Sequence, residues 1–215
     1  MFFIPIPPLL LPHPPTTSYI GLLLTPFALG IPLGSLLSGF LLRIHSATHP
    51  ATLAFLILLA STSLIFPLLY TNQIPSLYIH VPNMVLFGAA FGGSLVCMLI
   101  TLLALVPYEA QAVITSVSYA FRSTGSAIGI AISGSVFQNL LATGLDKRLS
   151  GKGPEAQEWV EKVKQSFEAV KDVPETWRGE VVASFVEALR AVWWVVGVAG
   201  VIALICGLRL RRIKL

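Results

Sequence analysis

Charged residues are scarce in this 215-residue sequence. Lys, Arg, Asp and Glu make up 11% of the chain, whereas soluble domains carry about 25% charged residues. Hydrophobic residues account for 55%, and the mean hydropathy is +0.81. This composition excludes an ordinary soluble domain and predicts a membrane protein, for which the bilayer is the solvent.

The sequence also lacks the motifs of common enzyme classes. It contains no Gly-x-Ser-x-Gly elbow, no phosphate-binding P-loop, no His-Glu-x-x-His motif and no pair of carboxylates inside an apolar block. The histidines show no spacing that predicts a metal site. We therefore expect no enzymatic activity, no cofactor and no metal. The two cysteines, Cys97 and Cys206, lie inside apolar blocks, which predicts buried thiols rather than a disulfide.

Five apolar blocks are long enough to cross a membrane, which takes about 20 residues at a rise of 1.5 Å per residue. They predict an all-α, polytopic bundle of about five transmembrane helices, at residues 18–43, 51–70, 78–106, 110–141 and 185–208. Residues 1–17 form an apolar, proline-rich lead. Its prolines and its lack of basic residues fit neither a spanning helix nor a signal peptide.

Basic residues at the carboxyl terminus predict the orientation of the chain. The tail after residue 208 carries Arg209, Arg211, Arg212 and Lys214, which places this end in the cytoplasm. Counting back over five spans places Arg43 and Glu109 in cytoplasmic loops. Four charges so close to lipid predict contact with anionic headgroups, not with nucleic acid.

Residues 144–184 form the one hydrophilic segment between spans, on the non-cytoplasmic side. Apolar residues recur there at helical spacing between charged ones, which predicts an amphipathic helix; they are Trp159, Val160, Val163, Phe167 and Val170. Such a helix lies on the membrane surface or on the rim of the bundle, or it serves as a substrate lid or partner site.

Small residues recur every four positions in three of the predicted spans. In lipid, such ridges let helix backbones approach closely, so they predict helix packing and possible sliding contacts. The residues are Gly30, Gly34, Gly88, Gly92, Gly125 and Gly129.

One cation, Arg122, lies inside the fourth predicted span, 13 residues after Glu109 and roughly 20 Å along the helix. A charge at the bilayer centre costs at least about 2.5–3.5 kcal/mol. Arg122 therefore faces a partner or a watery cavity, or it acts structurally by snorkelling toward headgroups.

Other polar residues in the spans have a functional and a structural interpretation. Asn83, Gln138 and Asn139 line a substrate path or form hydrogen bonds between helices. Glu109 caps a helix or carries a proton, and Arg43 anchors the first span or belongs to a gate. Glu187 and Arg190, three positions apart, predict a surface ion pair.

Two stretches carry a resemblance to a known family. Residues 21–43, GLLLTPFALGIPLGSLLSGFLLR, resemble a carboxyl-half helix of fungal major facilitator superfamily transporters in the pattern G-x4-P-x3-G-x3-G-S-x3-G-x3-R. Residues 107–141, PYEAQAVITSVSYAFRSTGSAIGIAISGSVFQNLL, are similar to the penultimate helix of the fourteen-span drug:proton antiporter group. The likeness covers nearly the whole chain, apart from the opening residues.

This resemblance implies a partial major facilitator fold, equivalent to the carboxyl-terminal portion of a transporter. It implies proton-coupled efflux of drugs, toxins or basic amino acids, a plasma or vacuolar membrane, and Arg122 as a cavity or gate residue. Five spans make less than one six-helix half, and the amino-half antiporter motifs have no counterpart here. The chain then needs a missing amino-terminal half or a partner membrane subunit. The alternative is a non-transporting fragment or accessory membrane subunit.

Overall fold

The described part of the chain is helical throughout. The computed structural model describes residues 17–45, 48–69, 77–149, 154–165 and 173–209, and no strand occurs among them. The helices are α2 (Thr17–His45), α3 (Thr48–Leu69), α4 (Leu77–Ala104), the short 3-10 helix η1 (Tyr108–Ala110), α5 (Gln111–Leu149), α6 (Pro154–Gln165) and α7 (Glu175–Leu208). Within these residues α2, α3, α4, α5 and α7 are long and apolar enough to cross a membrane, which confirms the predicted all-α class and its five spans. The proline-rich lead up to residue 16 and the basic tail from residue 210 lie outside the described residues.

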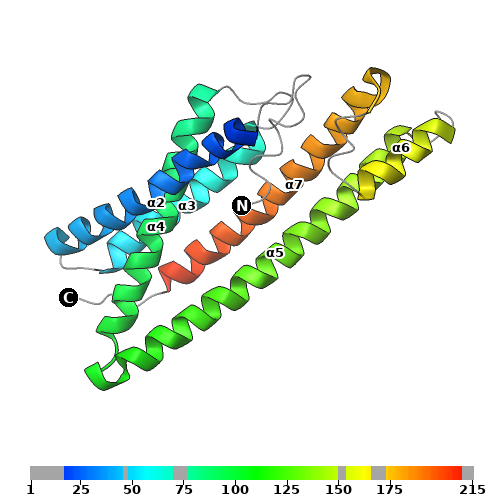
Figure 1. Cartoon of the computed structure of the whole chain (residues 1–215). Helices are drawn as coiled ribbons and strands as arrows, with labels where there is room; N and C mark the ends of the chain where they lie inside the picture. The colour runs from blue at the N-terminus through cyan, green and yellow to red at the C-terminus, as the bar shows by residue number, and fades with distance from the viewer. Residues whose placement is uncertain (1–16, 46–47, 70–76, 150–153, 166–172, 210–215) are drawn as a thin grey trace.

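The order of the helices in space differs from their order in the chain. Helix α4 packs against α2 and α3, α3 packs against α7, and α7 packs against α5, whereas α2 and α3 barely touch (Figure 1). The resulting order is α2, α4, α3, α7, α5. Helix α5 follows α4 through η1 but makes most of its contacts with α7.

Glycines bring α2 and α4 together at backbone distance. A Cβ atom added to Gly30 or Gly34 would overlap the backbone carbonyl oxygens of Val85 and Ala89 on α4. In the other direction, a Cβ at Gly88 or Gly92 would overlap the carbonyl oxygens of Phe27 and Ile31 on α2. Only glycine leaves room for this approach, which increases van der Waals contact between the two helices.

An aromatic cluster fills the space between α2, α3, α4 and α7. The ring of Phe66, which is fully buried, stacks on Trp193 at 4.1 Å between centroids and meets Phe87 edge-on at 5.7 Å. His80 lies edge-on to Phe66 at 6.2 Å. Edge and offset contacts of this kind add to the dispersion energy of the packed rings.

Buried hydroxyl groups are satisfied within their own helices. Each donates to a backbone carbonyl three or four residues earlier, as do Ser38, Thr62, Ser63, Ser94, Thr101 and Ser184. Of the two free thiols, Cys97 is buried, but Cys206 is exposed, so the prediction of two buried thiols is wrong for Cys206.

Helices α5 and α7 both extend beyond the predicted spans. Helix α5 continues to Leu149 and α7 begins at Glu175, so the predicted loop 144–184 is largely helical at both ends. The extensions pack on each other and on α6 through a junction cluster, which comprises Leu141, Leu145, Leu149, Val160, Val163, Val173, Val181, Phe185 and Ala188. The apolar face of α6 is therefore covered by protein. Phe167 and Val170 lie outside the described residues.

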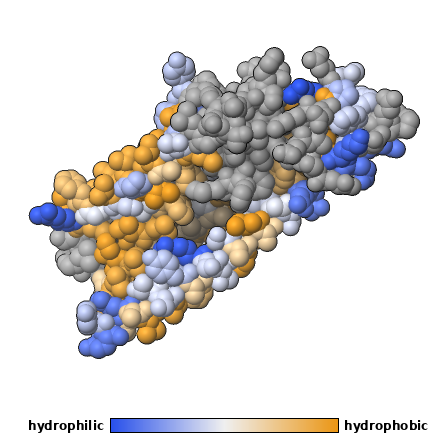
Figure 2. All heavy atoms as spheres, in the orientation of Figure 1, coloured by the Kyte–Doolittle hydropathy of each residue, from blue (hydrophilic) through white to orange (hydrophobic). Residues whose placement is uncertain are grey.

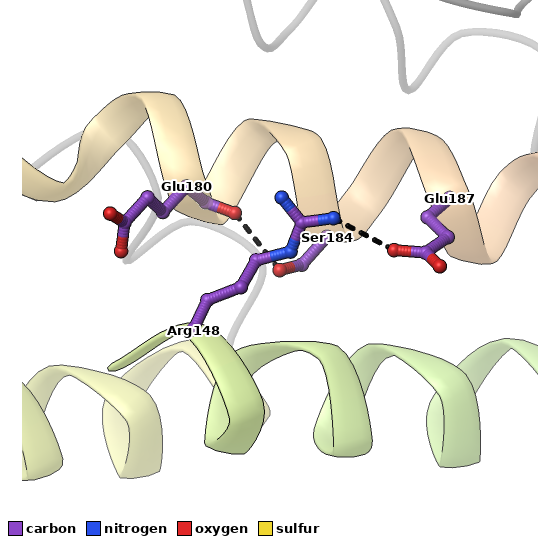
Figure 3. A network of polar contacts seen from close by, with 4 residues as sticks. All are labelled: Arg148, Glu180, Ser184 and Glu187. Carbon is purple, nitrogen blue, oxygen red and sulfur yellow. Dashed lines mark hydrogen bonds and ion pairs between the residues drawn. The ribbon is translucent and has the colours of Figure 1, made fainter. Parts of the chain in front are cut away.

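An ion pair joins the two long helices beside the junction cluster. Arg148 Nη2 on α5 donates to Glu187 Oε2 on α7 at 2.8 Å (Figure 3). Beside this pair, within α7, the Ser184 hydroxyl donates to the Glu180 carbonyl oxygen at 2.9 Å. The predicted pair of Glu187 with Arg190 is wrong, because Glu187 is turned toward α5.

Replacing Arg148 with alanine is expected to lower the free energy of unfolding by less than about 1 kcal/mol, because both side chains of the pair are partly exposed to water. Thermal unfolding of the two proteins at low salt and at about 1 M salt checks this, since the Debye length falls to about 3 Å at the higher concentration. The difference between them should shrink with salt. A larger, salt-independent loss would show that Arg148 acts through packing.

Candidate functional site

The middle of α5 is the least enclosed part of the bundle. All residues from Tyr119 to Ile132 are exposed, and the fully buried residues of α5 are confined to Leu141, Leu145 and Leu149. A Cβ atom added to Gly125 or Gly129 meets no heavy atom within 4 Å. The described part of the chain therefore brings no helix against this third glycine ridge, unlike the ridges on α2 and α4.

A polar stripe runs along one face of α5. Apart from the adjacent Gly125 and Ser126, its members follow at intervals of three or four residues, and all are polar or small. They are Gln111, Thr115, Ser118, Arg122, Gly125, Ser126, Gly129 and Ser133. Gln111, Thr115, Ser118 and Ser133 are half-buried, so the stripe faces the side of the neighbouring helices at both ends. The sequence predictions included its glycines and Arg122, but not its uncharged polar members.

The face of α5 away from the stripe is apolar and exposed, with Val113, Val117 and Ile128 among its residues. This face suits lipid. Yet α5 has the lowest hydropathy and the smallest buried share of the five spanning helices. In Figure 2 the surface over α2 and α4 is mostly orange, while the band along α5 is paler and includes blue. Helix α5 is thus two-faced, with one side fitted to hydrocarbon and the other to a polar environment.

Arg122 lies at the centre of the polar stripe. It is 11 residues from the start of α5, about 17 Å along a helix about 58 Å long. Its guanidinium carbon lies 5.0 Å from the centroid of the Tyr119 ring on the same helix, a cation–π contact. Among the described residues Arg122 forms no ion pair. A cation in this position can bind a carboxylate or another anionic group that approaches the stripe.

The other residues predicted to line a substrate path do not lie next to Arg122. Gln138 and Asn139 lie on α5, exposed, toward the junction cluster. Asn83 is buried on α4, six residues from the start of that helix, on the face that carries His80 and Phe87. Helices α4 and α5 run in opposite directions, so the start of α5 lies near the end of α4 (Figure 1). Asn83 is near the start of α4 and Arg122 is in the first third of α5, so the two lie at different levels of the bundle.

Arg43 and Glu109 are exposed at helix ends. Arg43 lies in the last turn of α2, where a cation favours the helix dipole, and Glu109 lies in η1, ahead of α5. Among the described residues, no group of three metal-ligating side chains occurs.

Comparison with known proteins gives one informative similarity. The chain is 25% identical over 201 residues to the multidrug resistance protein fnx1 of Schizosaccharomyces pombe (strain 972 / ATCC 24843). The match covers 93% of this chain and 38% of that protein, so the chain spans well under half of its relative's length. No family model and no solved structure matches the chain.

The five apolar helices and this similarity agree with each other. Both describe a multi-pass membrane protein. The similarity covers the glycine-packed pair α2 and α4 and the polar stripe of α5 alike, since it extends over nearly the entire chain. This chain is therefore a multi-pass membrane protein that is similar in sequence to a multidrug resistance protein.

Proposed function

We propose that this chain forms part of a major facilitator-type transporter that exports small organic compounds in exchange for protons. The observation that carries the proposal is the polar stripe of α5, which faces the bundle side and is not enclosed in its middle. A polar helix face inside a membrane protein is typical of a substrate path or a watery cavity. The drug-resistance relative supports export, and the substrate class remains drugs, toxins or basic amino acids.

Arg122 is the proposed substrate contact. A guanidinium attracts carboxylates and repels cations, so it discriminates among the three substrate classes. A basic amino acid offers a carboxylate to Arg122, whereas a cationic dye offers none. Asn83, Gln138 and Asn139 are proposed to line other levels of the path.

The proposed orientation follows from the basic tail. With the carboxyl terminus in the cytoplasm, Arg43 and Glu109 lie at the cytoplasmic surface, where a gate or anchor is needed. The junction cluster then lies on the opposite side of a plasma or vacuolar membrane.

A second candidate is a non-transporting fragment or an accessory membrane subunit. It is favoured by the open middle of α5, against which no described helix packs. In this case the polar stripe contacts helices of a partner membrane protein, and Arg122 pairs with a carboxylate on that partner.

The proposed function is tested with the purified chain in vesicles whose interior is acidic. Protons leaving the vesicles should drive uptake of radiolabelled lysine and of the cationic dye rhodamine 6G. Arg122→Gln is expected to reduce lysine uptake at least about tenfold, about 1.4 kcal/mol or more, because the carboxylate loses its partner. Dye uptake should not fall, since Arg122 repels a cation and its removal favours cation binding.

Arg148→Gln is the matched control, because Arg148 is the other arginine of α5 and lies outside the polar stripe. It should leave both uptake rates within about twofold of the original protein. Uptake of neither substrate by a folded, inserted chain would reject transport by the chain itself and favour the accessory subunit. Equal loss of both substrates in Arg122→Gln would reject carboxylate binding.

A further inference from the structure

Two buried nitrogen donors beside the aromatic cluster lack an acceptor among the described residues, in contrast to the buried hydroxyls. They are Asn83 Nδ2 on α4 and Arg190 Nε on α7. Asn83 is only 6% exposed, so water does not replace the missing partner. Buried donors in folded proteins are nearly always hydrogen-bonded, and an unpaired one requires an explanation such as a bound ion or ligand.

Both donors lie on the same side of one aromatic contact. The rings of Phe87 on α4 and Trp193 on α7 lie 6.1 Å apart, centroid to centroid. Asn83 precedes Phe87 by four residues, and Arg190 precedes Trp193 by three. Helices α4 and α7 run in the same direction (Figure 1), and helical side chains lean toward the amino-terminal end. The two donors therefore lie beyond the ring pair at the same end of the bundle.

The acidic residue nearest in sequence does not satisfy Arg190. Glu187 lies three positions earlier on α7, but its Oε2 accepts from Arg148 on α5 at 2.8 Å. An acceptor for the two donors therefore has to come from outside the described residues. One of them carries a full positive charge, so an anionic oxygen is the acceptor that suits both, and guanidinium favours phosphate and carboxylate.

The surroundings of the two donors indicate what carries this oxygen. The rings of Phe66, Phe87 and Trp193 form an apolar wall beside them, and the neighbouring Trp194 is exposed on α7. Tryptophan prefers the membrane interface, where headgroups meet acyl chains. We propose that Asn83 and Arg190 bind an anionic oxygen group carried on an apolar molecule, either a phospholipid phosphate or the carboxylate of a free amphiphile. This site is independent of Arg122 and does not depend on transport.

The test measures thermal unfolding of the full chain in an uncharged detergent. The probes are dioctanoyl phosphatidylglycerol, dioctanoyl phosphatidylcholine and 2-naphthoate. A ligand that binds the folded state raises the unfolding midpoint in proportion to its concentration over its Kd. We expect a rise with phosphatidylglycerol or with naphthoate, and little with phosphatidylcholine, whose headgroup carries no net charge. A rise with phosphatidylglycerol alone identifies a lipid source, and a rise with naphthoate identifies a free ligand.

Variants locate the effect. Arg190→Gln should weaken binding of the active probe at least about tenfold, and Asn83→Leu should weaken it less, because the lost hydrogen bond is uncharged. Without ligand, Asn83→Leu should unfold at or above the original midpoint, since it removes an unpaired polar group. Lys147→Gln is the matched control, because it removes an exposed cation from the last turn of α5, and it should bind normally. Equal losses of binding in Arg190→Gln and Lys147→Gln would overturn the proposal. No rise in the midpoint with either anionic probe, or an Asn83→Leu protein that is destabilised but still binds, would also overturn it.

Discussion

Replacing Gly34 with alanine is expected to separate α2 from α4. The added Cβ would lie 2.5 Å from the carbonyl carbon and 2.6 Å from the Cα of Ala89, and it would overlap that residue's carbonyl oxygen. These are backbone atoms, so no side-chain rotation relieves the clash, and the helices must move apart. We expect a loss of about 3 kcal/mol, at the upper end of overpacking effects.

Gly125→Ala is the matched control for this prediction. It makes the same chemical change on α5, where nothing lies within 4 Å of the new atom. Alanine favours helix over glycine by roughly 0.8–1 kcal/mol, so this variant should be as stable as the original protein or slightly more stable. Thermal unfolding of both variants in detergent measures the difference. Similar midpoints for the two variants would show that α2 and α4 do not meet through backbone contact.

Replacing Phe185 with alanine is expected to release α5 from α7. Phe185 is 1% exposed in the junction cluster, and its ring lies 6.0 Å from that of Phe137 on α5. Asp146, Lys147 and Arg148 lie beside this cluster, so we expect it to lie in water, where burial of apolar surface is favourable. Loss of a buried phenylalanine costs about 3–5 kcal/mol. Since every fully buried residue of α5 belongs to the junction cluster, the whole helix should loosen.

Hydrogen exchange of α5 backbone amides checks this result. The last turns of α5, around Leu145 and Leu149, should exchange much faster in Phe185→Ala. Ile202→Ala on the same helix is the control, because Ile202 is 55% exposed and contributes little packing. Unchanged protection of the α5 end in Phe185→Ala would mean that other contacts hold α5 in place.

The spans were predictable because apolar length alone determines which segments cross a bilayer. Their ends were not. Helices α5 and α7 continue past the apolar blocks because Leu145 and Leu149 on α5 belong to the same buried cluster as Val181 and Phe185 on α7. The sequence shows charges at these places, and only the tertiary contact explains why the helices extend through them.

The sequence alone predicted Arg122 as a candidate site residue, because a charge in a membrane span is costly, but it did not predict what surrounds Arg122. Arg122 is a single cation in an apolar segment, which indicates a functional role whatever direction its side chain takes. The glycine ridges look alike in sequence, yet those at Gly34 and Gly88 meet another backbone and the one at Gly125 meets open space. Arg148 and Glu187 are far apart in the chain, so their pairing depends on how α5 lies along α7. The missing acceptors of Asn83 and Arg190 follow from packing in the same way.

The spatial order of the helices also has a consequence for synthesis of the chain. Helix α2 has its closest neighbour in α4, and it has few contacts with α3, which follows it directly. The glycine surface of α2 therefore enters the membrane before its complement on α4 has been translated, and the two cannot pack while α3 inserts. Consecutive helices here belong to different packed pairs, α2 with α4 and α3 with α7. Helices α2, α3 and α4 thus become one assembled unit only after α4 has been inserted and joins α2 to α3.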